Sequence, residues 1–423
     1  MKLQNLFILR FCLSLPLIGI ALSLLLVNAY FPHLVLAQTT DEGGPYYKGV
    51  NMKGLYTSVA ETRGVDNSSF PQDYYEESFR LISDAGMNYV RYVFYWEAFV
   101  SDPEAFMNEL QTVANTADKY KINVLYDNHQ FHSSSWLNPQ RGTGFPSFLF
   151  ATDNSTLYPY KSGGSAKYST AEMWWSNWWD RSIKDPQGND GWTLLAGFLK
   201  DVVNLVDKHP STLGYEILNE PQVHSNAQWE KVGQFNTFMV NELRTVTQKT
   251  IAYSQQIPAS INDKKISVTS ENMAKMAPEN KTNVIFKISM YGLPMDNNFQ
   301  EKKLNVFLKA ADLANVPAYV GEWNDVERVK TVNAEGKTVW NITNEKTNID
   351  QMEANSYIQT FDNANVWGWS YWLWNFKPHD TVNFNLINVT SDGRIQPTEY
   401  YNILKNAIYF GNTGESYSYV IKP

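Results

Sequence analysis

The feature that most constrains the fold is a repeated pattern, in which a short apolar run is followed by a segment with helical periodicity. The apolar runs cover residues 47–52, 88–95, 122–126, 213–218, 265–269, 284–290, 317–320 and 366–373. Helix-period segments between them cover residues 74–85, 103–120, 192–208, 226–248, 302–314 and 348–363. Parallel strands that are buried on both faces are apolar throughout, so the pattern predicts an α/β fold, a (β/α)8 TIM barrel. A doubly wound sheet is the alternative, but no G-x-G-x-x-G follows the first run.

The mature chain reads as one domain. No Pro/Gly/Ser linker, charge block or low-complexity tract divides residues 38–423. The stretch 130–191 is long for a single connection, so we expect an enlarged loop after the third strand. This loop carries Trp174, Trp175, Trp178 and Trp179, whose spacing places the rings along one helical face. Two interpretations remain open for these rings, a local core or a platform that stacks on a ligand.

Residues 1–37 have the pattern of an export signal. Lys2 and Arg10 precede a charge-free apolar run over residues 11–27, and Ala37 ends a cleavage-type segment. The segment is either a cleaved signal peptide or an uncleaved signal anchor that spans the membrane. We therefore expect a secreted protein, or one that residues 11–37 anchor to the membrane. The single cysteine, Cys12, lies in this segment, so a mature chain would have no disulfide.

Charge and composition narrow the class of partner. The 423 residues include 35 Lys and Arg against 43 Asp and Glu, a formal net charge of -8. Such a chain lacks the basic surface that binds phosphate backbones, so we expect no nucleic-acid partner. The 14 Trp, 25 Tyr and 22 Phe are numerous. Flat rings either fill a core or stack on the faces of ring-shaped ligands such as sugars.

Polar residues stand where several predicted strands end. Arg91 lies in the second strand, Glu220 follows the fourth, and Glu322 follows the seventh. Active sites of (β/α)8 barrels form at this end of the strands. Two carboxyl groups at one barrel mouth suit cleavage of a glycosidic bond, because one must donate a proton while the other stays ionised. Arg91 could hold one carboxylate ionised, while burial keeps the other protonated.

The motifs Leu218-Asn219-Glu220-Pro221 and Val320-Gly321-Glu322-Trp323 resemble the signature of glycoside hydrolase family 5, the cellulase-like family of clan A retaining glycosidases. The resemblance extends over nearly the whole mature chain. It implies that Glu220 is the general acid/base and Glu322 the nucleophile. It also implies a substrate site formed by Arg91, His129, Asn219, Tyr291, Trp323 and Trp372.

Particular roles follow from the same resemblance. Asn219 would bind the sugar 2-hydroxyl, Arg91 and Tyr291 would contact the nucleophile, and Trp372 would lie beneath the reacting sugar; we prefer Trp372 to Trp374 for this place. One position departs from the family, since Ser289 stands where the family usually has a histidine. His129 and His132 could suggest a metal pair, but no third ligand is spaced nearby, so we expect no metal site.

The resemblance implies an exported retaining glycoside hydrolase that cleaves β-glucan or cellulose-type polysaccharides by double displacement. The reaction would need no cofactor. We expect a monomer whose partner is its carbohydrate substrate, with membrane contact only if the N-terminal segment stays uncleaved. A glycolipid or small β-glucoside hydrolase of the same family is an alternative, which His129-Gln130 and the ring-rich loop favour. A catalytically weak carbohydrate-binding barrel is another, suggested by Ser289.

Overall fold

The structure is a computed structural model, and it describes residues 47–63, 73–150, 158, 164–255, 266–291, 298–324, 328–332, 338–342, 351–375, 385–390 and 394–413. Residues 1–46 lie outside this set, as therefore do the proposed export signal and its cleavage point. Contacts divide the chain after Gln38, and Thr39–Pro423 forms one compact unit. Among the helices that the structure describes, none is both long and apolar enough to span a membrane.

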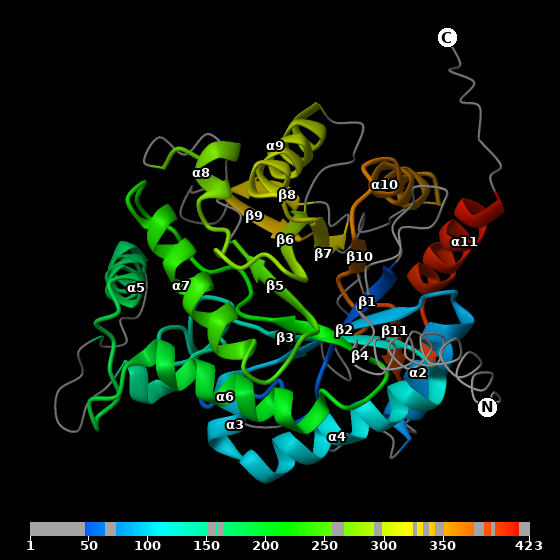
Figure 1. The fold of residues 1–423 in the computed structure, drawn as a ribbon. Coiled ribbons are helices and arrows are strands. Elements are labelled where there is room, and N and C mark those ends of the chain that lie inside the picture. The colour runs from blue at the N-terminus through cyan, green and yellow to red at the C-terminus, as the bar shows by residue number, and fades with distance from the viewer. Residues whose placement is uncertain are drawn as a thin grey trace, which may run out of the picture. The chain divides into compact units, whose positions relative to one another are not determined.

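Eight parallel strands close into a barrel at the centre of this unit (Figure 1). In order around the barrel they are β1 (Tyr47–Lys53), β2 (Tyr89–Phe94), β3 (Asn123–Asn128), β4 (Thr212–Glu216), β5 (Thr250–Ser254), β6 (Val284–Tyr291), β7 (Ala318–Asn324) and β10 (Gly368–Tyr371). β10 pairs with β1 and closes the ring. The predicted (β/α)8 barrel is confirmed.

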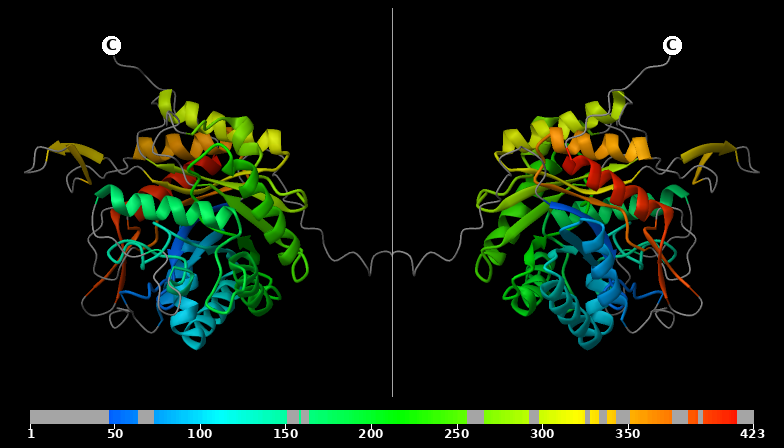
Figure 2. Two further views of the ribbon diagram at one scale, coloured as in Figure 1. Left: turned by 90° about the vertical axis from the view of Figure 1, so that its left-hand side faces the viewer. Right: turned by 90° about the vertical axis from the view of Figure 1, so that its right-hand side faces the viewer.

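Helices surround the strands, as the three views of Figures 1 and 2 show. They are α2 (Tyr74–Asp84), α3 (Trp96–Ser101), α4 (Pro103–Tyr120), α5 (Gly164–Trp179), α6 (Gly191–Val206), α7 (Gln228–Leu243), α8 (Ser270–Ala274), α9 (Asn298–Ala314), α10 (Gln351–Asn363) and α11 (Glu399–Thr413). Helix α4 shows why local sequence sets the bounds. Asp102 caps it by accepting from the Ala105 amide, Pro103 opens it, and Lys121 ends it in a left-handed conformation.

Two antiparallel hairpins lie outside the barrel, β8 (Arg328–Val332) with β9 (Thr338–Ile342) and β11 (Ile387–Val389) with β12 (Ile395–Pro397). The large core lies between the outer face of the barrel and its helices. A smaller cluster belongs to the strands themselves and consists of Tyr47, Tyr89, Leu125, Leu213, Ala252, Ile285, Tyr319 and Trp367. Its members come from β1 to β7 and from the start of the last strand, so they fill the barrel interior below the polar residues described next.

The predicted fifth strand at residues 265–269 is wrong. The strand β5 lies earlier, at Thr250–Ser254, and pairs with β4 and β6. The segment that was expected to be a strand leads instead into α8, because the Thr269 side chain accepts from the Asn272 amide and caps that helix. Ile266 and Val268 are buried although the segment forms no strand. Their burial explains why apolar and polar residues alternate there.

The enlarged loop after β3 contains a 3-10 turn, Ser147–Leu149, and helix α5. All four tryptophans of α5 are buried, at 0 to 2% exposure. Trp174 packs against Phe150 and Phe145, and Trp179 packs against Phe235 of α7. The rings therefore form a local core, and the alternative of a ligand platform is wrong.

Candidate active site

Glu220 and Glu322 lie at the C-terminal end of the barrel. Glu322 belongs to β7 and Glu220 follows β4. Glu220 has a positive φ of 46°, a conformation that costs a non-glycine residue about 1–3 kcal/mol and persists only where surrounding contacts hold it. Two long-range contacts do so. The Glu220 amide donates to Ser254 Oγ at 3.1 Å, and Gln130 Nε2 donates to the Glu220 carbonyl at 2.6 Å.

Glu322 is held ionised. Its Oε1 accepts from Arg91 Nη1 and from Lys287 Nζ, both at 2.9 Å, and its Oε2 accepts from the Tyr291 hydroxyl at 2.5 Å. Burial alone would favour the neutral acid. The charges of Lys287 and Arg91 overcome that effect and hold the pKa of Glu322 well below its usual range. A carboxylate in this state is suited to act as a nucleophile.

The surroundings of Glu220 favour its protonated form. Burial raises the pKa of Glu220 above its usual value, and the negative charge of Glu322 adds to the rise. Lys287, whose Nζ is 3.9 Å from Glu220 Oε1, and the Ser289 hydroxyl, which donates to the same oxygen at 2.6 Å, oppose it. The Glu220 side chain remains 15% exposed, whereas that of Glu322 is 4% exposed. The surroundings thus move the pKa values of two carboxyl groups at one barrel mouth in opposite directions.

Arg91 forms the centre of the network beneath this pair. Its guanidinium contacts Glu216 at 2.8 Å, Asp127 at 2.9 Å and Glu322 at 2.9 Å, and it donates to Asn51 and Asn219. Arg91 is 0% exposed. The expectation that it contacts the nucleophile agrees with this geometry. Its assignment to the substrate-binding set needs correction, because the guanidinium is fully buried and lies behind Glu322 and Asn219, the site residues that it contacts.

Asn219 and His129 form a second group beside the glutamates. Asn219 Oδ1 accepts from Lys287 at 2.6 Å, and its amide nitrogen donates to His129 Nε2 at 3.3 Å and to the Gln130 carbonyl at 3.2 Å. Burial lowers the pKa of His129 to about 3, so the ring is neutral and Nδ1 donates to Asp127. A sugar 2-hydroxyl bound by Asn219 would replace one of the two long amide contacts.

Trp372 and Trp323 lie in different places. Trp372 is half-buried and stacks on the His129 ring at 5.4 Å, at the mouth of the barrel. Trp374 is fully buried and donates to Ser78 of α2. Trp323 is also fully buried and packs against Tyr357 and Phe361 of α10. The prediction that Trp323 binds substrate is therefore wrong, because neighbouring strand residues face opposite sides and Glu322 faces inward.

Lys287 is the site residue that the motifs did not reveal. It lies in β6, two and four residues before Ser289 and Tyr291, and all three side chains reach the glutamates. The signal in the sequence is a single lysine inside the apolar run 284–290, at the inward-facing parity of the other two. Asp127 and Glu216 complete the network, and burial raises the pKa of each to about 7.

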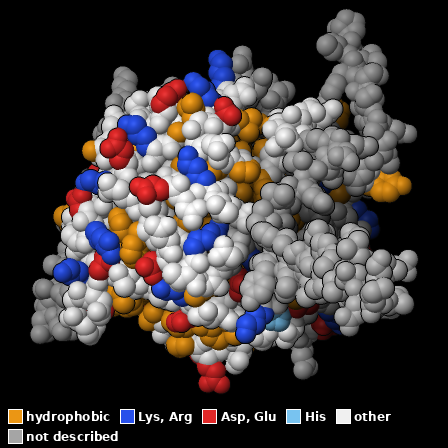
Figure 3. All heavy atoms as spheres, viewed as in Figure 1, with side chains coloured by type: hydrophobic (Ala, Val, Ile, Leu, Met, Phe, Trp, Pro, Cys, Tyr) orange, Lys and Arg blue, Asp and Glu red, His pale blue; other side chains and the backbone are white. Residues whose placement is uncertain are grey.

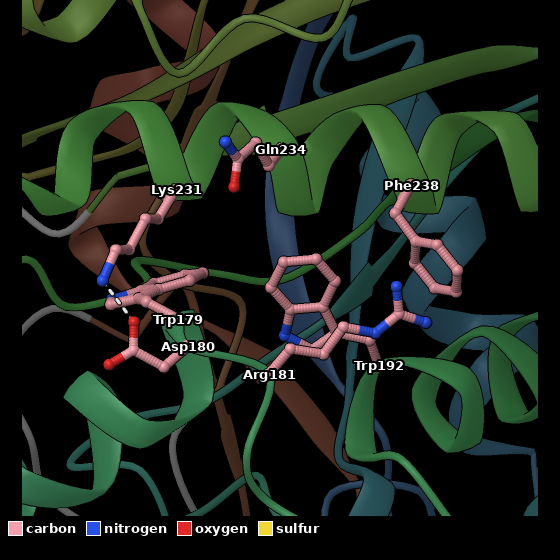
Figure 4. A pocket seen from close by; sticks show the side chains of 7 residues that line it. All are labelled: Trp179, Asp180, Arg181, Trp192, Lys231, Gln234 and Phe238. Carbon is pink, nitrogen blue, oxygen red and sulfur yellow. Dashed lines mark hydrogen bonds and ion pairs between the residues drawn. The ribbon is translucent and has the colours of Figure 1, made fainter.

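A separate hollow lies outside this mouth. Figure 4 shows a hollow in the helical layer, where Lys231 of α7 pairs with Asp180 and Arg181 stacks on Trp192 and Phe238. It contains none of the mouth residues. Figure 3 shows acidic and basic side chains interspersed over one face. Within the described part of the chain, no three His, Cys, Asp or Glu side chains are grouped to hold a metal ion.

Two glutamates at the mouth of a (β/α)8 barrel, one with a raised and one with a lowered pKa, form an arrangement typical of a glycosidase active site. The family comparison agrees with this class. Residues 46–378 match the family model described as Cellulase (glycosyl hydrolase family 5). The chain belongs to glycoside hydrolase family 5.

Two endoglycoceramidases are similar in sequence to part of this chain. An endoglycoceramidase of Hydra vulgaris is 28% identical over 183 residues, which cover 38% of this chain and 34% of that protein. One from Cyanea nozakii is 25% identical over 205 residues, 42% of this chain and 38% of that protein. The chain thus spans little more than a third of the curated relatives that it matches.

Solved structures share the fold. An endogalactoceramidase superposes with a TM-score of 0.61 at 16% identity, covering 85% of this chain and 80% of that chain. A lactosyl-enzyme intermediate of endo-glycoceramidase II from Rhodococcus sp. gives 0.59 at 15% identity, covering 85% and 78%. An endoglucanase Cel5A of Pseudomonas stutzeri gives 0.52 at 14% identity, covering 88% and 96%. At these identities the likeness concerns the barrel fold.

Proposed function

We propose that the protein is a retaining β-glycosidase that cleaves the bond between a sugar and the lipid part of a glycolipid. The observation that carries the chemistry is the opposite direction in which the surroundings move the pKa values of Glu220 and Glu322. Glu322 attacks the anomeric carbon while Glu220 gives its proton to the leaving oxygen. Glu220 then takes a proton from a water molecule, which attacks the same carbon and releases Glu322.

The geometry is compatible with retention. Lys287 Nζ lies 2.9 Å from Glu322 Oε1 and 3.9 Å from Glu220 Oε1, so these two oxygens are separated by no more than the sum of the two distances. The separation of about 5–5.5 Å that retaining enzymes need falls within this bound.

The lipid part of the proposal rests on an exposed ring in the loop after β3 and on the relatives. Phe131 is 47% exposed and follows Gln130 in the chain, and the Gln130 side chain donates to the Glu220 carbonyl. An exposed ring on this loop is compatible with an apolar leaving group. Both curated relatives described above are endoglycoceramidases. A β-glucan is the second candidate, because the matching family model is described as Cellulase. Export, a monomeric state and membrane attachment through residues 11–37 remain proposals.

A substrate panel tests the proposal. The purified protein is incubated with an aryl β-glucoside, a fluorescent β-glycosyl ceramide and cello-oligosaccharides, and released sugar is measured. We expect release from the first two, and loss of about a hundred-fold or more of kcat in Glu220→Gln and in Glu322→Gln. Glu271→Gln is the control, since Glu271 is 61% exposed and pairs with Lys309 on the surface. Full activity in either glutamate variant refutes the roles, and sugar binding without release favours a carbohydrate-binding barrel.

A further inference from the structure

Lys287 lies between the two glutamates with all of its donors in use. Its ammonium group donates to Asn219 Oδ1 at 2.6 Å, Ser289 Oγ at 2.8 Å and Glu322 Oε1 at 2.9 Å. Lys287 and Ser289 are both 0% exposed. Ser289 Oγ is in turn 2.6 Å from Glu220 Oε1. One chain of hydrogen bonds therefore connects the nucleophile to the acid/base.

The direction of each hydrogen bond in this chain is fixed. An ammonium group can only donate, so Ser289 Oγ accepts from Lys287. The single hydroxyl proton of Ser289 must then go to Glu220 Oε1, which acts as an acceptor. The proton that Glu220 carries as an acid consequently resides on Oε2. Among the described residues no hydrogen bond to Glu220 Oε2 is present, which leaves this oxygen to face a leaving group.

We propose that Lys287 and Ser289 form a relay that keeps the acidic proton on Glu220 Oε2 and lets one lysine compensate the two glutamates in turn. This inference rests on the proposed roles of Glu220 and Glu322. In the first step the bond from Glu322 to the anomeric carbon forms, the bond to the leaving oxygen breaks, and the proton of Glu220 Oε2 moves to that oxygen. Glu322 has then lost its charge and Glu220 has gained one. Lys287, already connected through Ser289, stabilises the new carboxylate.

The second step reverses the charges. A water oxygen bonds to the anomeric carbon, the ester to Glu322 breaks, and the water proton moves to Glu220 Oε2. Lys287 again faces an ionised Glu322. The relay therefore occupies the place of the histidine that the family usually has at position 289, and Lys287 and Ser289 are positioning residues because neither needs to touch the substrate.

Other groups face the same carboxyls and must be considered. The charged or titratable groups that act on Glu220 are Glu322, Lys287, Tyr291, His129 and Lys303 of α9, and Lys287 acts also on Asp127 and Glu216. His129 is neutral. Lys287 is the cation that a hydrogen-bond chain connects to Glu220, so its removal should have the specific effect described next.

The test uses Lys287→Met and Ser289→Ala with a dinitrophenyl β-glycoside. This leaving group needs no acid, so Glu220 acts only as the base of the second step and must be ionised. The rate kcat then falls at low pH as Glu220 becomes protonated, and this fall is the acid limb of its pH profile. In Lys287→Met we expect the acid limb of kcat to move to higher pH by about one to three units. Azide attacks the glycosyl-enzyme without a general base, so azide should restore kcat at low pH.

Ser289→Ala separates the two halves of the relay. It should move the acid limb of kcat in the same direction by a smaller amount, because Glu220 loses a hydrogen bond but keeps the nearby cation. The acid limb of kcat/KM reports on Glu322 in the free enzyme. That limb should move in Lys287→Met and stay in place in Ser289→Ala. Ser289→Ala removes one hydroxyl and decides the matter if Lys287→Met does not fold.

Two controls make the result specific. Lys48→Met removes a lysine at the opposite end of β1, where Lys48 pairs with Asp362 at 3.4 Å, and should keep the native pH profile. Glu220→Ala with azide checks the underlying chemistry: without rescue, the acid/base role itself fails. If azide rescues Glu220→Ala but neither relay variant shifts its acid limb of kcat, the relay alone is overturned. A Lys287→Met enzyme with reduced kcat, a native pH profile and no azide rescue would also overturn the relay alone.

Discussion

Replacing Arg91 by methionine should cost far more stability than replacing any surface arginine. Arg91 is fully buried and contacts three carboxylates, those of Glu216, Asp127 and Glu322, at 2.8 to 2.9 Å. Removing one partner of a buried ion pair costs about 3–5 kcal/mol, because the other charge is left uncompensated. With three partners left behind, we expect Arg91→Met to lie at the upper end of that range at pH 8.

The pH dependence of this loss has a definite sign. Burial already raises the pKa of Asp127 and of Glu216 to about 7, and loss of Arg91 raises both further. A carboxyl group whose pKa is higher in the folded than in the unfolded protein contributes stability at low pH that is lost as the pH rises through the folded pKa. At pH 5 both groups are protonated with or without Arg91. The loss in Arg91→Met should therefore be smaller at pH 5 and grow as the pH rises above 7.

Urea unfolding at pH 5 and pH 8, followed by tryptophan fluorescence, measures this. The matched control is Arg80→Met on α2, since Arg80 also contacts two carboxylates at 2.6 Å but is 46% exposed. Exposed pairs contribute about 0–1 kcal/mol, so the control should change stability little at either pH. Equal losses in the two variants at pH 8, or a larger loss in Arg91→Met at pH 5 than at pH 8, would refute the reasoning.

Two further predictions concern the mouth itself. Tyr291→Phe removes the 2.5 Å hydrogen bond to Glu322, which should raise the pKa of Glu322 and move the acid limb of the pH profile of kcat/KM to higher pH. An unmoved limb contradicts this. Trp372→Ala should lower kcat/KM with a modest loss of stability, whereas Trp374→Ala should lose about 3–5 kcal/mol of stability with KM unchanged. Urea unfolding and initial rates check this pair, and the reverse ranking would place Trp374 at the substrate.

The barrel could be predicted because most of its strands are long enough to show as apolar runs. Strand β5 could not, since Thr250–Ser254 has just one strongly apolar aliphatic side chain. The alternating segment 266–268 resembled a strand more closely, and its Ile266 and Val268 are buried although they form no strand. The last strand shows a second limit. Trp367 lies in the inner cluster although Trp369, two residues later, packs against Trp323 outside, so a two-residue period does not place both rings.

Residues of the site differ in how far sequence could reveal them. Glu220 and Glu322 stand beside the turn residues Pro221 and Gly321, and Arg91 is a single charge within an apolar run, so each has a local signal. The error at Trp323 was avoidable, because an inward Glu322 requires an outward neighbour. The hydrogen bonds that fix the Glu220 backbone could not be predicted, since they come from Gln130 and Ser254, which lie 90 and 34 residues away in the chain. Only the closed barrel brings them together.

The charge balance of the barrel explains why the glutamates differ. Arg91 and Lys287 are two fully buried cations, and they face four carboxyl groups, those of Asp127, Glu216, Glu220 and Glu322. Ionising all four would leave an uncompensated negative charge in a buried site, which is costly. Glu322 contacts both cations and stays ionised, so the two cations are balanced when one of the other three carboxyl groups is also ionised. Asp127 and Glu216 lie in register on β3 and β4 and compete for Arg91. Glu220, bonded to neither cation directly, keeps the proton that a leaving group needs.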